Sequence, residues 1–325
     1  MYDGRQEKMK PQAHSIKKIN PTVHELTRIL LAAAFCFMII WSRHLQRGVA
    51  SSLQYVGEVL IPSIFPFAVL SGIYAHVEKG DCCSRPVCRI ASALHLTPVS
   101  LSALPLGLFA GFPLGGKYVV DLYNERRISK EEATRLFCMV NNPSAAFVIV
   151  GVGTGMLRSS FLGLLLFSAV LISGYTVGYI GKYTPPPSPC KSLCASEPWH
   201  LSALIRDATL TTVCVSGYVV FFSALTTVFT AILPNDLLRM LIVLPAEVTG
   251  GCAYAASLGA SLPLRMCLLG FVLGFGGICV GMQSEIYLRE GSLKVATYYK
   301  RKLAQGVLCA IVSFLFTHLF QLCTL

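Results

Sequence analysis

Four interruptions of apolar segments carry the residues of greatest chemical interest in this 325-residue sequence. They read Gly111-Phe112-Pro113-Leu114-Gly115-Gly116, Asn141-Asn142-Pro143, Thr249-Gly250-Gly251 and Gly274-Phe275-Gly276-Gly277. A helix interrupted inside a membrane leaves backbone N–H groups free, and the positive end of its dipole attracts anions. Such backbone is tolerated at membrane depth only where protein or water satisfies it. The four interruptions therefore predict a central polar cavity.

Three of these interruptions predict the start of a half-helix. Asn142-Pro143 has the composition of an N-cap followed by proline at the first helical position. Gly115-Gly116 and Thr249-Gly250-Gly251 predict two further starts, where glycine lets a substrate approach the backbone closely. The alternative is that these glycines and prolines only pack or kink the helices.

The candidate substrate-binding residues lie in the four interruptions or close to them. They are Gly111, Pro113, Gly115, Gly116, Lys117, Asn141, Asn142, Ser144, Thr249, Gly250, Gly251, Gly276, Gly277 and Gln283. Gln283 belongs to this set because it follows the last glycine pair by one to two helical turns and can donate hydrogen bonds.

Three ionisable residues fall within or beside apolar segments, where a charge is costly unless it is paired or faces a polar cavity. Lys117 is interpreted either as a counter-charge for an anionic substrate or as a lysine that extends toward the membrane surface. Glu58 and Glu247 either bind a coupling ion or neutralise Lys117 and buried backbone donors. The second interpretation of the two glutamates is favoured.

Enzymatic chemistry is not expected. The sequence has no G-x-S-x-G, H-E-x-x-H or Walker A motif, so no catalytic residue and no cofactor is assigned. Cys82, Cys83 and Cys88 with Cys190 and Cys194 lack the spacing of a zinc site, and no metal is expected there. Most other cysteines lie in apolar segments, as buried thiols do.

Composition indicates a polytopic helical membrane protein. Hydrophobic residues make up 54% of the chain and charged residues only 13%, and the mean hydropathy is +0.62. That apolar surface exceeds what one soluble core could bury, so the lipid bilayer is the expected partner. The net charge is +11, and the lysine and arginine residues that produce it lie in loops between apolar segments. This placement argues against nucleic-acid binding. The oligomeric state stays open, with a homo-oligomer among the alternatives.

The apolar segments divide the chain into two halves. Residues 1–25 are predicted to form a basic cytoplasmic tail, and 26–45 an uncleaved first transmembrane span. Residues 183–200 form a proline-rich linker, and the segments 46–182 and 201–325 show the same order of apolar stretches and interruptions. This order indicates an internal repeat.

The distribution of lysine and arginine predicts how the halves cross the membrane. If residues 98–120 and 238–259 enter and leave on the same side, 22 of the 27 basic residues lie on the cytoplasmic side. If every segment spans, only 16 of them do. The expected fold is therefore an all-α integral membrane protein, with about seven full spans plus two re-entrant hairpins. Each half then crosses an odd number of times, which makes an inverted repeat of broken helices.

The first half also resembles a known family. Gly111 to Lys117, then Arg127-Ile128-Ser129-Lys130-Glu131-Glu132-Ala133 and Asn141-Asn142-Pro143-Ser144, are similar to the YlbJ (SpoVV) sporulation integral membrane proteins. In the second half, Phe275 to Gln283 resembles the second glycine break of that family. The resemblance covers roughly residues 50–320. It implies membership of the wider nucleoside-recognition (Gate) domain group, with 46–182 and 201–325 as two Gate-like repeats.

The function implied by this resemblance is transport. It implies export of a small anionic substrate, dipicolinic acid, from the mother cell across the outer forespore membrane during sporulation. One alternative is a nucleoside or ion transporter of the same wider fold. Another is a non-transporting membrane scaffold for spore-envelope assembly.

Overall fold

The computed structural model describes residues 21–77, 85–180 and 200–324, and in these ranges the chain is helical and forms no strand. The predicted all-α class is thereby confirmed. The predicted linker up to residue 199, the tail up to residue 20, and Cys82, Cys83, Cys190 and Cys194 lie outside the described residues.

The chain forms two compact units, residues 1–43 and 44–325. In the first unit, α1 (Pro21–Ile40) carries apolar side chains that are exposed, among them Leu30, Phe35 and Ile39. The turn at Trp41 separates α1 from α2 (Ser42–Tyr55), so the segment predicted as one span over 26–45 contains the end of one helix and the start of another.

The second unit contains the remaining elements, and those before the linker are taken as four groups in chain order. They are α2 with η1 (Val56–Leu60) and α3 (Ile61–Val77); α4 (Arg85–Ala93) with η2 (Pro98–Ser102), α5 (Ala103–Phe109) and α6 (Leu114–Asn124); α7 (Lys130–Val140) with η3 (Ala146–Met156); and α8 (Ser160–Tyr179). Two of the helices begin at serine N-caps, because the Ser129 and Ser159 side chains accept from the backbone N–H three residues on.

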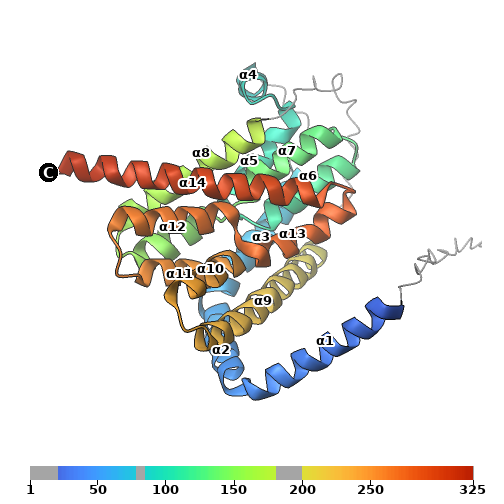
Figure 1. The fold of residues 1–325 in the computed structure, drawn as a ribbon. Helices are drawn as coiled ribbons and strands as arrows, with labels where there is room; N and C mark the ends of the chain where they lie inside the picture. The colour runs from blue at the N-terminus through green and yellow to red at the C-terminus, as the bar shows by residue number, and fades with distance from the viewer. Residues whose placement is uncertain (1–20, 78–84, 181–199, 325) are drawn as a thin grey trace, which may run out of the picture. The chain divides into compact units, whose positions relative to one another are not determined.

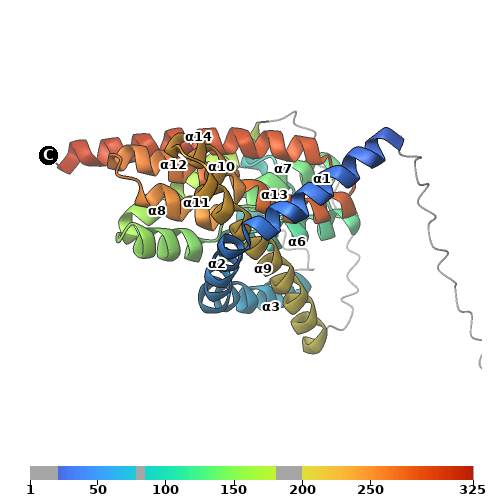
Figure 2. The ribbon, with the colours of Figure 1, turned by 60° about the horizontal axis from the view of Figure 1, so that its bottom comes forward.

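After the linker, the chain forms one long helix, then two pairs of shorter helices, and then a second long helix. They are α9 (Leu201–Ile232), α10 (Asp236–Ala246), α11 (Val248–Ser257), α12 (Leu262–Phe275), α13 (Gly277–Glu290) and α14 (Val295–Thr324). Figures 1 and 2 show α14 lying along α12, with α8 beside it, and these helices contact one another. In the same unit α3 packs against α9.

Five helical stretches among the described residues are long and apolar enough to cross a membrane. They are Ser42–Val77, Ser160–Tyr179, Leu201–Ile232, Leu262–Glu290 and Val295–Leu322. A sixth is counted if Arg85–Ala93 and Pro98–Phe109, which meet at 90°, form one broken span. The structure thus agrees with a protein that crosses a membrane several times, whereas the count of seven spans plus two hairpins remains a prediction.

The distribution of side chains on α14 is the reverse of that on a surface helix of a soluble protein. Its buried face carries the polar side chains Lys302, Gln305, Ser313 and Thr317, while the exposed side chains are Leu303, Val307, Ile311, Leu315 and Leu319. A polar inner face with an apolar outer face is stable when the surrounding solvent is lipid.

Candidate functional site

A hollow lies where the interrupted helices of both halves of the sequence come together. It encloses about 560 Å³, its open mouth included. Residues from α2, η1, α3, η3, α9, α11 and α13 and from the breaks after α5, α7 and α10 line it: Tyr55, Leu60, Ser63, Ile64, Ala110, Phe112, Pro143, Ser144, Phe147, Val215, Val219, Glu247, Val248, Thr249, Cys279, Val280 and Gln283.

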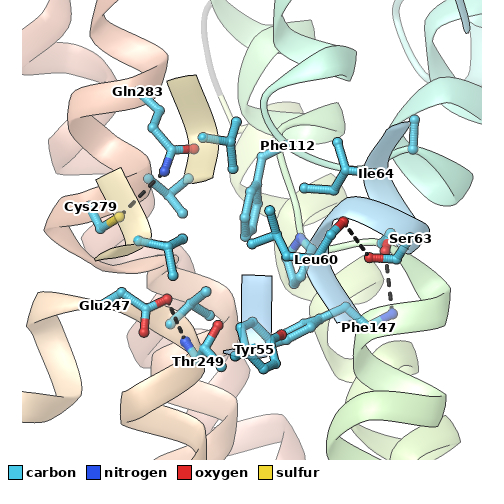
Figure 3. Close-up of a pocket in the computed structure, with 17 residues that line it drawn as sticks. Tyr55, Leu60, Ser63, Ile64, Phe112, Phe147, Glu247, Thr249, Cys279 and Gln283 are labelled. Carbon is cyan, nitrogen blue, oxygen red and sulfur yellow. Dashed lines mark hydrogen bonds between the residues drawn. The ribbon is translucent and has the colours of Figure 1, made fainter. Parts of the chain in front are cut away.

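The walls of the hollow are apolar and aromatic, with a few polar groups between them. Figure 3 shows Glu247, Thr249, Cys279 and Gln283 on one side and Phe112 on the other, toward α3 and η3. Among the described lining residues there is no lysine, arginine or histidine. The arrangement suits a flat, largely apolar ligand that carries polar groups at its edge.

Gln283 has an unused hydrogen-bonding atom in this wall. Its side chain is 3% exposed, and its Nε2 donates to Cys279 Sγ at 3.3 Å, while its Oε1 has no partner. A buried amide oxygen without a partner is destabilising, and a bound ligand would remove that cost. Gln283 is therefore the lining residue that points most directly to a ligand.

The two breaks of the first half are packed against each other. The Phe112 N–H donates to Asn142 O at 2.8 Å. Gly111 has φ +69°, and a Cβ at this position would lie 2.6 Å from Ser144 N. Only glycine adopts this backbone conformation readily, and only glycine leaves room for the second break. The close contact places Phe112 and Ser144 in the same wall.

The two breaks of the second half are packed in a corresponding way. A Cβ on Gly277, which has φ +78°, would lie 3.2 Å from Ala246 O. Next to it, the Glu247 carboxylate caps α11 by accepting from Thr249 N at 2.8 Å and Gly250 N at 2.7 Å. Glu247 is only 2% exposed. Its two side-chain oxygens cap the N-terminus of α11, so these two N–H groups are already occupied.

The structure brings Ser144, Thr249 and Gln283 of the candidate binding residues to the hollow, and Glu247 with them. The other candidates are close to the breaks but do not line it: Gly111, Pro113, Gly115, Gly116, Lys117, Asn141, Asn142, Gly250, Gly251, Gly276 and Gly277. Several of these glycines permit close packing of helices, since a Cβ on Gly115 would lie 2.9 Å from Val140 O.

Two of the predicted half-helix starts are wrong in detail. Asn142 is not an N-cap, because η3 begins at Ala146 and it is the Ser144 hydroxyl that accepts from Phe147 N, at 3.3 Å. Gly115 and Gly116 do not precede a helix, because α6 begins at Leu114 and both lie in its first turn. The start predicted near Thr249 agrees with α11, which begins at Val248.

The prediction that Glu58 or Glu247 neutralises Lys117 is wrong, whereas Glu247 does accept from backbone donors, as predicted. The Lys117 ammonium forms an ion pair with Asp207 of α9, away from the hollow. Glu58 is exposed and accepts a hydrogen bond from Gln54 Nε2 at 3.0 Å, and Glu247 caps α11. Lys117 therefore joins α6 to α9 in this structure.

Sequence reasoning missed a buried polar network behind the break at Asn141. Lys302, which follows Lys300 and Arg301 in a basic run, is 1% exposed and lies within α14. Its Nζ donates to Asn141 O and Asn142 Oδ1, each at 3.2 Å, and to Gln305 Oε1 at 2.8 Å. The spacing of Tyr298, Lys302, Gln305 and Cys309 places them on one helical face, and this pattern could have revealed the network.

The described residues contain no cluster of three or more His, Cys, Asp or Glu side chains that could hold a metal ion. Cys88 is a free, partly exposed thiol.

Comparison with known proteins gives one informative match. The chain is 26% identical over 340 aligned positions to the sporulation integral membrane protein YlbJ of Bacillus subtilis strain 168. The match covers 88% of this chain and 82% of that protein. The resemblance to the YlbJ family is thereby confirmed. Together with the apolar helices described above, this similarity supports an integral membrane protein.

No family model matches the chain, so membership of the wider nucleoside-recognition (Gate) group remains a prediction. No solved structure matches the chain either.

Proposed function

We propose that this protein is a membrane transporter that exports a small carboxylated aromatic molecule, dipicolinic acid, from the mother cell across the outer forespore membrane. The observation that carries the proposal is the hollow, because residues at or beside all four helix breaks line it from both halves of the sequence. Transporters bind substrates at the interface between repeats, where helices are discontinuous. The sporulation context comes from the similarity to YlbJ.

The helix contacts support an inverted repeat. Each half has the order long helix, hairpin, broken helix, long helix, which pairs α3, α5–α6, α7–η3 and α8 with α9, α10–α11, α12–α13 and α14. The contacts between the halves also correspond. Helix α6 of the first half contacts α13 of the second half. In the same way α11, the counterpart of α6, contacts η3, the counterpart of α13. The predicted twofold relation accounts for these crosswise contacts.

Helix lengths support the two re-entrant hairpins. The arms α6, α10 and α11 have 11, 11 and 10 residues. At about 1.5 Å per residue, none exceeds about 17 Å, whereas the apolar part of a bilayer is about 30 Å thick. The arms of each pair contact each other, as in a hairpin that enters and leaves on one side.

The chemistry of the hollow is compatible with a planar aromatic ring. Phe112, Phe147 and Tyr55 offer ring faces and edges, and the Ser144 hydroxyl and the Gln283 amide offer polar contacts at the rim. Rotation of the Gln283 amide presents its N–H₂ group to a carboxylate.

A buried lysine behind the wall of the hollow, Lys302, supplies positive electrostatic potential for an anion. The Lys302 ammonium contacts Asn141 and Asn142, which directly precede the lining residues Pro143 and Ser144. In a low-dielectric interior a buried charge acts over more than its contact distance.

Uptake by vesicles that contain only this protein tests the proposal. We expect saturable uptake of labelled pyridine-2,6-dicarboxylate, inhibited by benzene-1,3-dicarboxylate, which has the same carboxylates without the ring nitrogen, but not by uridine. Uptake of uridine in place of the dicarboxylate would identify a nucleoside transporter, and no uptake of any solute would favour a scaffold. In a sporulating host, deletion should leave dipicolinate in the mother cell and deplete it in the spore.

A further inference from the structure

Lys302 is a buried cation whose partners are all neutral. Its ammonium contacts a backbone carbonyl, Asn141 O, and two side-chain amide oxygens, Asn142 Oδ1 and Gln305 Oε1, at 2.8–3.2 Å. Among the described residues, no ion pair joins Lys302 to a carboxylate. A buried lysine is ordinarily paired with an acidic side chain, so this arrangement needs another explanation.

The hydrogen bonds identify the three oxygens as acceptors. Asn141 O is a carbonyl, and the Asn142 Nδ2 group donates to Met139 O at 2.7 Å, which leaves its oxygen toward Lys302. Gln305 Nε2 donates to Asn142 Oδ1 at 2.6 Å, which orients Gln305 Oε1 toward the ammonium. Three acceptors match the three N–H bonds of an ammonium, whereas a neutral amine has only two.

The position of these oxygens also attracts a cation. Asn141 is the C-cap of α7, where the last carbonyls of the helix have no partner in the next turn. The negative end of the α7 dipole therefore faces the Lys302 Nζ. Unwound carbonyls and half-helix C-terminal ends of this kind are the groups that coordinate monovalent cations in transporters built from broken helices.

We propose that the Lys302 ammonium is a tethered substitute for a bound monovalent cation at the break between α7 and η3. The lysine stem carries the charge from α14 to an oxygen site that would otherwise require Na⁺ or K⁺. The break that places Pro143 and Ser144 in the hollow is then held without either ion. As a consequence that rests on the proposed transport function, a gradient of Na⁺ or K⁺ does not drive transport through this site.

Thermal unfolding of the purified full chain in detergent tests the tethered cation without any substrate. The buffers contain choline chloride, NaCl, KCl or methylammonium chloride at equal ionic strength. We expect the native protein to melt at the same temperature in all four. The Lys302→Ala variant should melt about 5–10 °C lower in choline. In at least one of NaCl, KCl and methylammonium chloride, the melting temperature of this variant should recover by at least half of the difference. The recovery should saturate as the concentration of the cation rises. If the variant cannot be purified in choline, the yield of purified protein in methylammonium buffer is compared with the yield in choline buffer.

Two further variants make the result specific. Lys300→Ala removes an exposed lysine from the same helix and should behave as the native protein. Lys302→Met keeps an unbranched apolar stem in the space and should lose stability without recovery in any cation. Equal melting of Lys302→Ala and the native protein in choline would overturn the proposal. A loss of stability or yield that no small cation restores would do so as well. Since no transport is measured, failure here is distinct from failure of the proposed function.

Discussion

Replacement of Gly111 by alanine tests whether the two breaks of the first half are packed as the structure has them. The backbone there is left-handed, which costs an alanine about 1–2 kcal/mol. The added Cβ would also lie 2.6 Å from Ser144 N and 3.0 Å from Asn142 O, and both of these atoms are backbone. Displacing packed backbone costs a further 1–3 kcal/mol, roughly. We therefore expect Gly111→Ala to lower the free energy of unfolding by about 2–5 kcal/mol.

Unfolding in mixed micelles of dodecyl maltoside and dodecyl sulfate measures this loss. The matched control is Gly217→Ala in α9, where a Cβ would meet nothing within 4 Å. Because alanine is the better helix former, the control should be neutral or more stable by about 0.5–1 kcal/mol. Equal unfolding midpoints for the two variants would refute the packing of Gly111 against Ser144.

Three other predictions concern an ion pair, a lining residue and the topology. Lys117→Asp and Asp207→Lys should each lower stability by up to about 1 kcal/mol, and the double exchange should restore it in the same unfolding assay, since both side chains are partly exposed. Independent effects of the two changes would contradict the pair. Gln283→Leu should weaken dicarboxylate binding by about 10–150-fold in equilibrium binding, with Ser216→Ala unchanged as the control. Unaltered binding by Gln283→Leu would remove this residue from the site. Reporter fusions at Arg127 should be cytoplasmic, like those at the N-terminus, and an external location would exclude the first re-entrant hairpin.

The fold class and the positions of the breaks could be predicted because their signals are local. Long apolar stretches require helices in lipid, and glycine pairs such as Gly276-Gly277 interrupt them where the structure has a left-handed backbone. The N-cap assigned to Asn142 failed because its side chain found partners on α14, 160 and 163 residues away. A capping rule considers only the next turn and cannot include such a contact.

The site was harder to predict because it depends on contacts between distant segments. Asp207, the partner of Lys117, lies 90 residues further along the chain. Lys302 stands next to Lys300 and Arg301, and this basic run has the composition of a membrane-surface loop. The packing of α14 against α7 buries Lys302 between the helices, which the composition of this basic run does not indicate.

The central claim is that the hollow binds the substrate, and protection of a cysteine placed in its wall tests that claim most directly. In a variant without the native cysteines, Ser144→Cys introduces a thiol into the hollow, and Ser216→Cys introduces one at a similarly exposed position outside it. The rate of alkylation is measured for each purified protein with and without pyridine-2,6-dicarboxylate. The account predicts that the dicarboxylate slows alkylation of Ser144→Cys in a saturable manner and leaves Ser216→Cys unaffected. The claim would be contradicted if alkylation of Ser144→Cys proceeded at the same rate at every concentration of the dicarboxylate, in a protein that transports it.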